Sequence, residues 1–446
     1  MSNTRNIILS LAISFCACLL VRAQKADSVR IHKLGEVVIK ENKKEKEFRS
    51  TTPLQVLDAN QLKQSGSILV SDAVKFFSGV VVKDYGGIGG LKTISVRSLG
   101  ANHTAVVYDG ITINDSQTGQ IDLGKLTLDN VEEISLLSGQ DDNIFQSARL
   151  FSAASVLNIK SPAPVFNKKK TNASATFKGG SFGLLNPGFH LNHQWNKIFS
   201  SSVNVDYMRA DGDYPYTQLN GTATERQKRL NSDIETVKTE ANLFARFSNH
   251  EKASMKAYYY FSDRGLPSNK LYNSRATERL KDNNFFAQAN YENKFSDRWS
   301  LLTNGKFNWG YNKYSNPDNA TYNAATENNY YQNEYYLSGT VMFRPSPLLS
   351  FSLANDGSIN TMRADMANFV YPTRFTLLNA FAAKYVNNRF TATAHILSTL
   401  TRESVRTGTA ADNRNRLSPS VSLSYQPIKK ENLRLRLLYK DIFRLP

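Results

Sequence analysis

The sequence has few cysteines and, beyond its start, no long apolar run. Its two cysteines, Cys16 and Cys18, both lie within the first 23 residues. A mature chain that has lost this stretch would hold no thiol, which excludes disulfides and cysteine-bound metal. After residue 23 no stretch reaches the length of about 18 apolar residues that a membrane-spanning helix needs. Stabilisation by disulfides and a helical membrane domain are therefore not expected.

Residues 1–23 are predicted to be a cleaved secretory signal peptide. Arg5 supplies the positive start, residues 7–20 form an apolar run, and Ala23 offers a small residue for cleavage. A membrane anchor is the alternative interpretation, but a run of about fourteen residues is short for a span. We therefore expect an exported protein.

The chain is basic, with a formal net charge of +17. Such a balance suggests nucleic acid as a partner. However, lysine and arginine are spread along the chain, and only residues 43–46 and 168–170 form short basic runs. Because an exported chain does not meet cytoplasmic DNA, no nucleic-acid partner is expected.

Two regions with different patterns follow the signal. Residues 24–50 are polar and flexible in composition, with one apolar island at 34–39. This island is either a segment that adds as a strand to a partner's sheet or the first strand of the next domain. Residues 51–162 mix a helix pattern with short strands, and Asp109-Gly110 is typical of a tight hairpin. The predicted helix covers 70–77, and the predicted strands cover 80–82, 93–96, 104–108, 111–113 and 131–137.

From about residue 170 onward, apolar and polar residues alternate with a period of two. Around residue 256 one face carries apolar side chains and the other carries polar ones. Strands of about ten to twelve residues with this alternation are typical of a membrane-embedded β-barrel, because strands of a soluble sandwich are shorter. The apolar face holds Ala253, Met255, Ala257, Tyr259 and Phe261, and the polar face holds Lys252, Ser254, Lys256 and Tyr258.

The expected connections also alternate between short turns and long loops. This sorting is a property of outer-membrane barrels, which have short turns on one side and long loops on the other. Short turns are predicted at 196–197, 248–250, 296–297, 345–347, 387–388 and 427–430. Long polar loops are predicted at 211–234, 263–283, 311–331, 362–373 and 403–415.

Several motifs, in order, make residues 34–446 resemble the TonB-dependent receptor family. That family has an α+β plug domain inside an antiparallel transmembrane barrel. The resemblance assigns 24–50 to a flexible segment with a TonB box, 51–162 to the plug and 168–446 to a partial barrel. The matching segments are LGEVVI at 34–39, LVSDAVKFFSGV at 69–80, ISVRS at 94–98, VVYDGI at 106–111, VEEISLLSG at 131–139 and VLNIK at 156–160.

Two features depart from the family pattern. Residues 145–154 lack every glycine of a turn in which the family usually has several, so the local geometry there is expected to differ. The closing segment YKDIFRLP at 439–446 resembles one that lies well inside the barrel. The sequence predicts about thirteen strands, whereas the resemblance implies about twenty-two. The chain is therefore expected to be a fragment, from a truncated, interrupted or split gene.

The resemblance implies import without chemistry, powered by a periplasmic TonB-type protein in the outer membrane of a Gram-negative bacterium. The TonB-type protein would pair with the box by strand addition. The predicted partners are this protein, outer-membrane lipid, a scarce ligand and a surface lipoprotein. The box comprises Leu34, Gly35, Glu36, Val37, Val38 and Ile39.

Candidate site residues follow from their positions in the plug and the first long loop. A solvated surface role is the alternative for the locking charges, and a solvated loop is the alternative for the loop residues. The charges predicted to lock the plug to the barrel are Arg97, Glu132 and Glu133. The residues predicted to contact ligand are Tyr85, Asp115, Gln117, Asp211, Asp213, Tyr214 and Tyr216.

Enzymatic function has little support in the sequence. Gly86 to Gly90 is not followed by the residues of a phosphate loop, and no nucleophile elbow is present. His190 and His193 fall on opposite faces of a predicted strand, so they do not chelate together. No cofactor or metal site is expected. Vitamin B12 (cobalamin) is the preferred ligand, a ferric siderophore is the alternative, and a non-transporting barrel remnant or surface-binding protein is the alternative of another class.

Overall fold

The computed structural model describes residues 47, 50–115, 117–166, 169–221, 223–267, 277–317, 325–428 and 433–443. The chain divides into two compact units, residues 1–42 and 43–446, and every described residue belongs to the second. The predicted signal peptide and the predicted TonB box lie outside the described residues. Among the described residues, no helix is both long enough and apolar enough to cross a membrane.

The N-terminal part of this unit is a small α+β domain built on a five-stranded sheet. The sheet has the order β1-β6-β7-β4-β5, and only the β4–β7 pair is parallel. A second, two-stranded sheet pairs β2 with β3. The strands are β1 Leu54–Asp58, β2 Val80–Asp84, β3 Lys92–Val96, β4 Thr104–Tyr108, β5 Ile111–Ile113, β6 Glu133–Ser138 and β7 Ser155–Lys160. The short helices are α3 Ala59–Gln64, α4 Val70–Ala73 and α5 Ala148–Phe151.

Local sequence explains several of these elements. Asp109 and Gly110 adopt φ angles of 48° and 85°, as a tight β4–β5 hairpin requires, so the hairpin prediction is confirmed. The Asp58 carboxylate caps α3 by accepting a hydrogen bond from the backbone N–H of Gln61. The Gln61 side chain in turn accepts a hydrogen bond from the backbone N–H of Asp58. The helix predicted over 70–77 is α4 followed by one 3-10 turn, Val74–Phe76.

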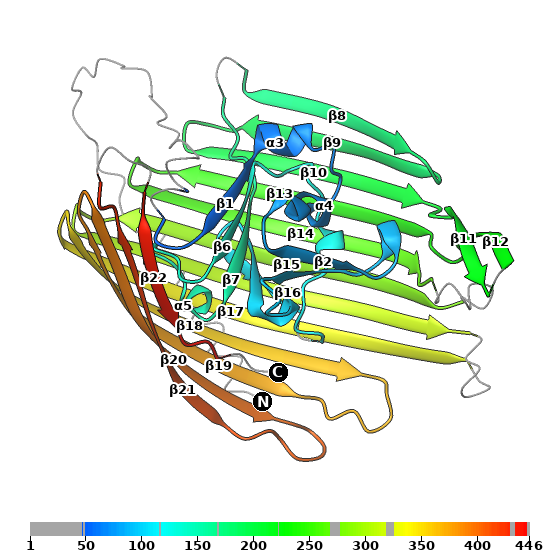
Figure 1. The fold of residues 1–446 in the computed structure, drawn as a ribbon. Helices are drawn as coiled ribbons and strands as arrows, with labels where there is room; N and C mark the ends of the chain where they lie inside the picture. Colours follow the sequence, from blue (N-terminus) through cyan, green and yellow to red (C-terminus); the bar gives the residue numbers. More distant parts are fainter. Residues whose placement is uncertain are drawn as a thin grey trace, which may run out of the picture. The chain divides into compact units, whose positions relative to one another are not determined.

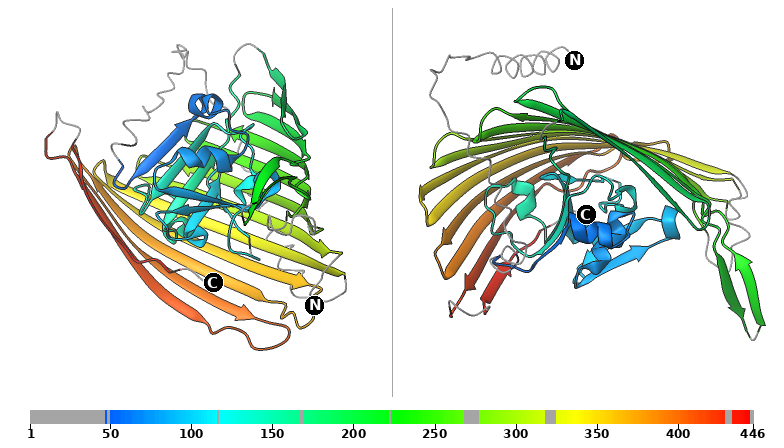
Figure 2. Two further views of the ribbon diagram at one scale, coloured as in Figure 1. Left: turned by 45° about the vertical axis from the view of Figure 1, so that its right-hand side comes forward. Right: turned by 90° about the horizontal axis from the view of Figure 1, so that it is seen from above.

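The rest of the unit is one antiparallel sheet of 13 strands, in agreement with the predicted number. Its order is β22-β21-β20-β19-β18-β17-β16-β15-β14-β13-β10-β9-β8, so β8 and β22 are its two edges. The sheet curves around the α+β domain, which lies against its concave face (Figures 1 and 2). The strands are β8 Thr171–Gly180, β9 Leu184–Gln194, β10 Phe199–Ala210, β13 Ile234–Arg246, β14 Glu251–Gly265, β15 Arg279–Lys294, β16 Trp299–Asn316, β17 Thr326–Ser346, β18 Leu349–Ala364, β19 Thr373–Val386, β20 Phe390–Ser404, β21 Arg414–Tyr425 and β22 Leu435–Lys440.

The large sheet turns its polar face inward and its apolar face outward. In β14 the side chains of Lys256 and Tyr258 are buried, whereas Met255 is 59% exposed and Tyr259 is 38% exposed. This matches the two faces predicted from alternation. A soluble sheet would bury the apolar face instead, so the arrangement favours lipid contact outside and plug contact inside.

The predicted sorting of connections is present between β9 and β21, whereas the turn predicted at 427–430 falls in the longer connection 426–434 and lies partly outside the described residues. The predicted strand length is wrong for the central strands. The connections 195–198, 247–250, 295–298, 347–348 and 387–389 have two to four residues. β16 and β17 have 18 and 21 residues, because their ladder continues to the pair Asn316 and Thr326. This continued pairing satisfies the backbone N–H and C=O groups of residues that the sequence predicts to lie in a loop.

The region predicted as a loop over 211–234 instead contains a hairpin of its own. Strands β11 Pro215–Asn220 and β12 Ala223–Lys228 form a two-stranded sheet separate from the large one. Residues 215–228 are mostly polar and show no alternation of polar and apolar side chains, so the sequence does not indicate these two strands. The loop prediction for this connection is therefore wrong in its secondary structure.

Candidate functional site

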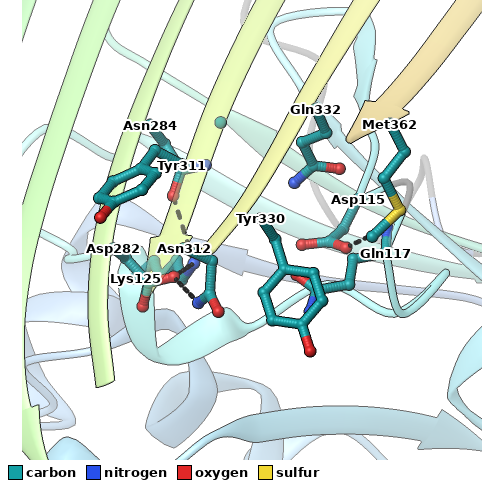
Figure 3. A pocket seen from close by; sticks show the side chains of 11 residues that line it. Asp115, Gln117, Lys125, Asp282, Asn284, Tyr311, Asn312, Tyr330, Gln332 and Met362 are labelled. Carbon is teal, nitrogen blue, oxygen red and sulfur yellow. Dashed lines mark hydrogen bonds and ion pairs between the residues drawn. The ribbon is translucent and has the colours of Figure 1, made fainter. Parts of the chain in front are cut away.

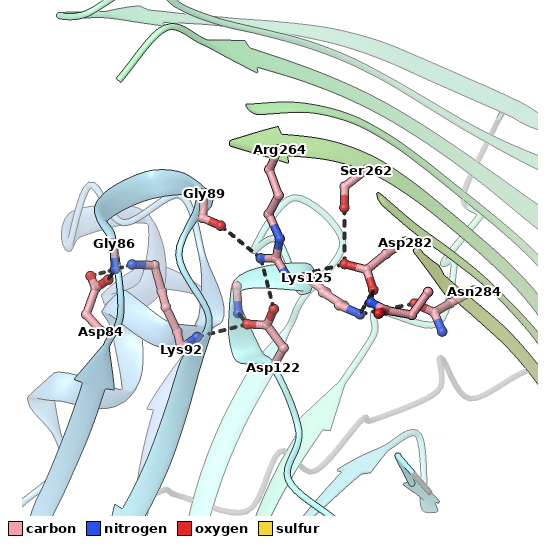
Figure 4. Close-up of polar contacts among 12 residues, drawn as sticks. Asp84, Gly86, Gly89, Lys92, Asp122, Lys125, Ser262, Arg264, Asp282 and Asn284 are labelled. Carbon is pink, nitrogen blue, oxygen red and sulfur yellow. Dashed lines mark hydrogen bonds and ion pairs between the residues drawn. The ribbon is translucent and has the colours of Figure 1, made fainter. Parts of the chain in front are cut away.

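A network of ion pairs joins the α+β domain to the wall at strands β14 and β15. Lys125, in the 3-10 turn Leu123–Lys125, lies 3.0 Å from an oxygen of Asp282. Arg264 bridges Asp122 and Asp282, at 3.2 Å from each, and donates to the carbonyl of Gly89 (Figure 4). Burial disfavours the charge on Lys125, but Asp282 and Asp122 outweigh it and raise the pKa of Lys125.

A second group of contacts centres on Glu240 of β13, which is fully buried. Its carboxylate accepts hydrogen bonds from Tyr108 at 2.5 Å and from Asn130 at 2.7 Å, both in the α+β domain. Lys256 of β14 bonds Glu240 and lies 2.9 Å from Asp109. Burial and the charge of Glu240 raise the pKa of Tyr108 well above its usual value, so its hydroxyl remains a donor.

A third group holds helix α5 against strands β17 and β18. Asp356 accepts from the backbone N–H groups of Ala148 and Arg149, at 3.0 and 2.7 Å. The Arg149 guanidinium pairs with Glu334 at 2.7 Å and lies 4.2 Å from the ring centre of Tyr336. Burial opposes the charge of Arg149, but Glu334 and Tyr336 raise its pKa. A carboxylate of the wall thus caps a helix of the inner domain.

This third group explains the segment without glycine. None of residues 145–154 has a positive φ, so the backbone there needs no glycine. Phe151 is 1% exposed and packs at a tilt against His395 of β20, with ring centres 4.8 Å apart. Ala148 and Phe151 also share an apolar cluster with Leu378 and Leu397 of the wall. In place of the glycine-containing turn, the chain therefore forms a short helix that packs against the wall.

Two cavities lie between the α+β domain and the wall. The larger, of about 350 Å³, is lined by residues 102–106, 112–115, 117–119, 149 and 152–154 together with residues of β18, β19 and β20. The smaller, of about 20 Å³, holds little more than one water and lies beside Lys125 and Asp282 (Figure 3). Asp115 and Gln117 line both cavities. Within the described residues, no three His, Cys, Asp or Glu side chains could hold a metal ion together.

Comparison with known proteins agrees with this geometry. Residues 46–150 match the model of the TonB-dependent Receptor Plug Domain. The vitamin B12 transporter BtuB of Vibrio vulnificus (strain YJ016) is 25% identical over 167 residues, which cover 36% of this chain and 27% of that protein. Residues 46–150 are therefore a plug domain of the TonB-dependent receptor type, and these matches support that family for the chain.

Solved structures of receptors with a similar fold cover most of the chain. The FrpB iron transporter of Neisseria meningitidis (F5-1 variant) gives a TM-score of 0.67 over 85% of this chain and 62% of its own, at 11% identity. The ferric yersiniabactin uptake receptor FyuA of Yersinia pestis gives 0.62 over 85% and 63%, at 13% identity. The chain thus spans less than two thirds of these relatives, and the likeness establishes the plug and barrel fold.

In this TonB-dependent receptor fold, the predicted ligand residues fall into separate places. Asp115 and Gln117 line the cavities between plug and wall. Tyr85 is 59% exposed at the end of the β2 strand and lines neither cavity. Asp213 pairs with Lys228 at 3.0 Å on the β11–β12 hairpin, away from both cavity linings.

The remaining loop residues surround the start of the same hairpin. Asp211 lies 3.8 Å from Arg209, and Tyr214 packs edge-on against Phe182. Tyr216 is buried and donates its hydroxyl to Gln227 at 2.9 Å. These residues shape the hairpin base, and their role toward a ligand stays a prediction.

The predicted locking charges are not those of the three groups of contacts described above. Arg97 is exposed beside Gly79, and no ion pair of Arg97 occurs among the described residues. Glu132 and Glu133 are partly buried at the start of β6. Their locking role stays a prediction.

The plug side chains that make these three groups of contacts are Tyr108, Asp109, Asp122, Lys125, Asn130 and Arg149. Asp109 and Arg149 belong to motifs that the sequence singled out. Their partners on the wall are more than 100 residues away, which is why no local pattern indicated the pairs.

Proposed function

We propose that this chain forms the plug and part of the barrel of a TonB-dependent outer-membrane transporter that imports a scarce ligand. The observation that carries the proposal is a receptor plug domain seated on the polar, concave face of an antiparallel sheet whose outer face is apolar. Three groups of plug–wall contacts are ion pairs and hydrogen bonds, and these polar groups can be hydrated when the plug and the wall separate.

The proposed energy source is a TonB-type protein in the periplasm. This protein pairs with residues 34–39 by strand addition and pulls on the plug. Backbone hydrogen bonds supply the affinity of such pairing, so most side-chain changes are tolerated. A proline removes one donor and fixes the backbone angle, and it blocks the pairing.

The preferred ligand is a corrinoid such as vitamin B12. The similarity to a vitamin B12 transporter over 167 residues supports this choice. A ferric siderophore is the second candidate, because FrpB is an iron transporter and FyuA is a ferric yersiniabactin uptake receptor. The similarity of this chain to both proteins is one of fold. We assign ligand contact to Asp115 and Gln117 first, because they line the cavities, and to the hairpin residues second. A surface lipoprotein is a further proposed partner.

The direct test is Val37→Pro in the protein as expressed from its gene, with Val37→Thr as the matched control. We expect Val37→Pro to abolish uptake of labelled vitamin B12 and to leave binding of the vitamin to cells unchanged. The control should do neither, because a threonine keeps the backbone donor. Normal uptake by the proline variant would reject the assigned box, and absence of uptake in the parent would favour a non-transporting remnant or surface-binding protein.

A further inference from the structure

The charged side chains of the larger cavity point to the class of ligand it takes. We propose that this cavity binds an uncharged ligand rich in amide or hydroxyl groups, rather than an anionic metal chelate. The inference rests on the proposed function and narrows it. The cavity of about 350 Å³ lies between plug residues 112–115 and 117–119, Arg149 of α5 and strands β18 to β20.

Both cationic side chains in the described lining already hold a carboxylate. Arg149 pairs with Glu334 of β17 at 2.7 Å. Arg374 of β19 pairs with Glu403 of β20, which also lines the cavity. Each pair joins two different elements, so the partners are placed by the fold and not by chance contacts of flexible loops. Glu334 also pairs with Lys306 at 3.0 Å, and Asp356 accepts from the Arg149 backbone, so two carboxylates face the two cations at that position. The charges around both guanidinium groups are thus balanced before any ligand enters.

The remaining carboxylate of the lining is also engaged. Asp115 accepts hydrogen bonds from the backbone of Gln117 at 2.9 Å and of Thr118 at 3.0 Å, and from the Thr118 hydroxyl at 3.2 Å. It therefore shapes its own loop. His103 also lies in the described lining, where its ring nitrogens can take part in hydrogen bonds.

An anionic ligand would have to compete with these pairs. To bind Arg149 it would need to displace Glu334, whose side chain is 1% exposed. Glu334 would then keep Lys306, at 3.0 Å, as its one cationic partner among the described residues, and the loss of one partner from a buried ionic group is costly. Uncharged groups meet no such obstacle, because the lining offers amides and hydroxyls, among them Asn102, Gln117, Ser358, Asn360, Thr376 and Thr399. A site built from such groups selects ligands that return their hydrogen bonds.

The test compares uncharged and anionic probes on the full-length protein purified in detergent. The uncharged probes are cyanocobalamin, a ferric trihydroxamate and a neutral malto-oligosaccharide, and the anionic probe is a ferric triscatecholate. We expect at least one uncharged probe to bind at least about tenfold more tightly than the triscatecholate. Its affinity should be the same at low and high ionic strength, because no net charge is recognised.

A variant pair sharpens the test. Glu403→Gln removes the carboxylate partner of Arg374 and should raise the affinity for the triscatecholate by about tenfold. Glu327→Gln is the matched control, because it breaks the Lys313–Glu327 pair at 2.8 Å, which does not line the cavity, and it should change nothing. The inference is overturned if the triscatecholate binds the parent as tightly as every uncharged probe, if no uncharged probe binds, or if Glu403→Gln leaves its affinity unchanged. In each of these cases the proposed transport function could still hold. It would be supported if the parent takes up any probe and Val37→Pro abolishes that uptake.

Discussion

At the residue scale, the buried carboxylates that join the plug to the wall each hold several partners, as Glu240, Asp282 and Asp356 show. Glu240 is fully buried yet bonds Tyr108, Asn130 and Lys256. Removing one member of such a set costs about 3 to 5 kcal/mol, because the other charge is left buried without its partner. The same polar groups are well solvated when they are exposed to water. The contacts therefore fix one position of the plug when it is seated, and the polar groups are hydrated when it separates from the wall.

One plug carboxyl should make the plug sensitive to pH. Burial and the adjacent Asp142 raise the pKa of Asp141 to about 6, from 3.8. A carboxyl whose folded pKa is raised stabilises the fold below pH 3.8, and this contribution is lost as the pH rises through about 6. Asp141→Asn should therefore weaken the fall in plug stability between these pH values and stabilise the plug at pH 7.

Hydrogen exchange of the backbone at residues 139–143, followed between pH 4 and pH 7 after correction for intrinsic rates, would measure this. Asp58→Asn would be a poor control because Asp58 caps α3. Asp297→Asn, in a short turn between β15 and β16, is a suitable one. An unchanged pH profile in Asp141→Asn would contradict the expectation.

At the scale of elements, α5 shows how a four-residue helix becomes stable. A helix of this length does not form alone in water, because nucleation is unfavourable. Asp356 supplies the cap, Arg149 reaches Glu334, and the Thr340 hydroxyl donates to the carbonyl of Gln146 at 2.9 Å. Every one of these partners lies on β17 or β18. The helix therefore exists because the wall holds it.

Asp356→Asn tests this dependence. The amide retains one acceptor but turns an N–H group toward the helix N-terminus, so the cap is weakened by about 1 to 2 kcal/mol. Exchange of the Ala148 and Arg149 amides should speed up by about five- to thirtyfold. Asp365→Asn is the matched control, because Asp365 bonds Asn329 at the loop side of the same sheet. Equal exchange in Asp356→Asn and the parent would show that packing of Phe151 alone holds α5.

At the scale of the whole 43–446 unit, the large sheet exposes apolar side chains on its outer face and buries polar ones on its inner face, which is the reverse of a soluble protein. Large apolar side chains such as Leu353 and Phe381, which pair across β18 and β19, are 49% and 50% exposed. Facing them on the inner side, Ser352 is 2% exposed. This distribution is stable only where the outer face meets lipid.

In the proposed membrane setting, Leu353→Lys should destabilise the folded sheet by about 2 to 4 kcal/mol, because an ammonium group near the middle of a bilayer is poorly solvated. Denaturant titration of protein folded into lipid vesicles would measure the change. Met366→Lys is the control, because Met366 is 42% exposed in the connection between β18 and β19 and should be neutral. Equal stability of the two variants would contradict a lipid-facing position for Leu353.

Much of the fold could be predicted from sequence because it is set by short-range patterns. Alternation with a period of two identified the strands and their faces, and Asp109-Gly110 identified the β4–β5 hairpin. The ends of strands were less predictable. The polar ends of β16 and β17 have the composition of loops, and only their mutual pairing makes them strands.

The candidate site was predicted in part. Asp115 and Gln117 were chosen from their place in a plug loop, and that loop lies at both cavities. The pairs that hold the plug could not be found in this way, because Glu240, Asp282 and Asp356 lie far along the chain from their plug partners. Nothing in a local pattern states which inward carboxylate meets which plug residue.

The sequence by itself determined the two-part organisation, the antiparallel sheet, its two faces and the sorting of its connections, because each depends on residue type at fixed short spacing. The tertiary structure decided which charges are paired, whether residues 145–154 are helical and how the cavity is lined. Those features arise where curvature of the sheet brings its inner face against the plug, and the energy of a buried charge depends on the neighbours it then finds.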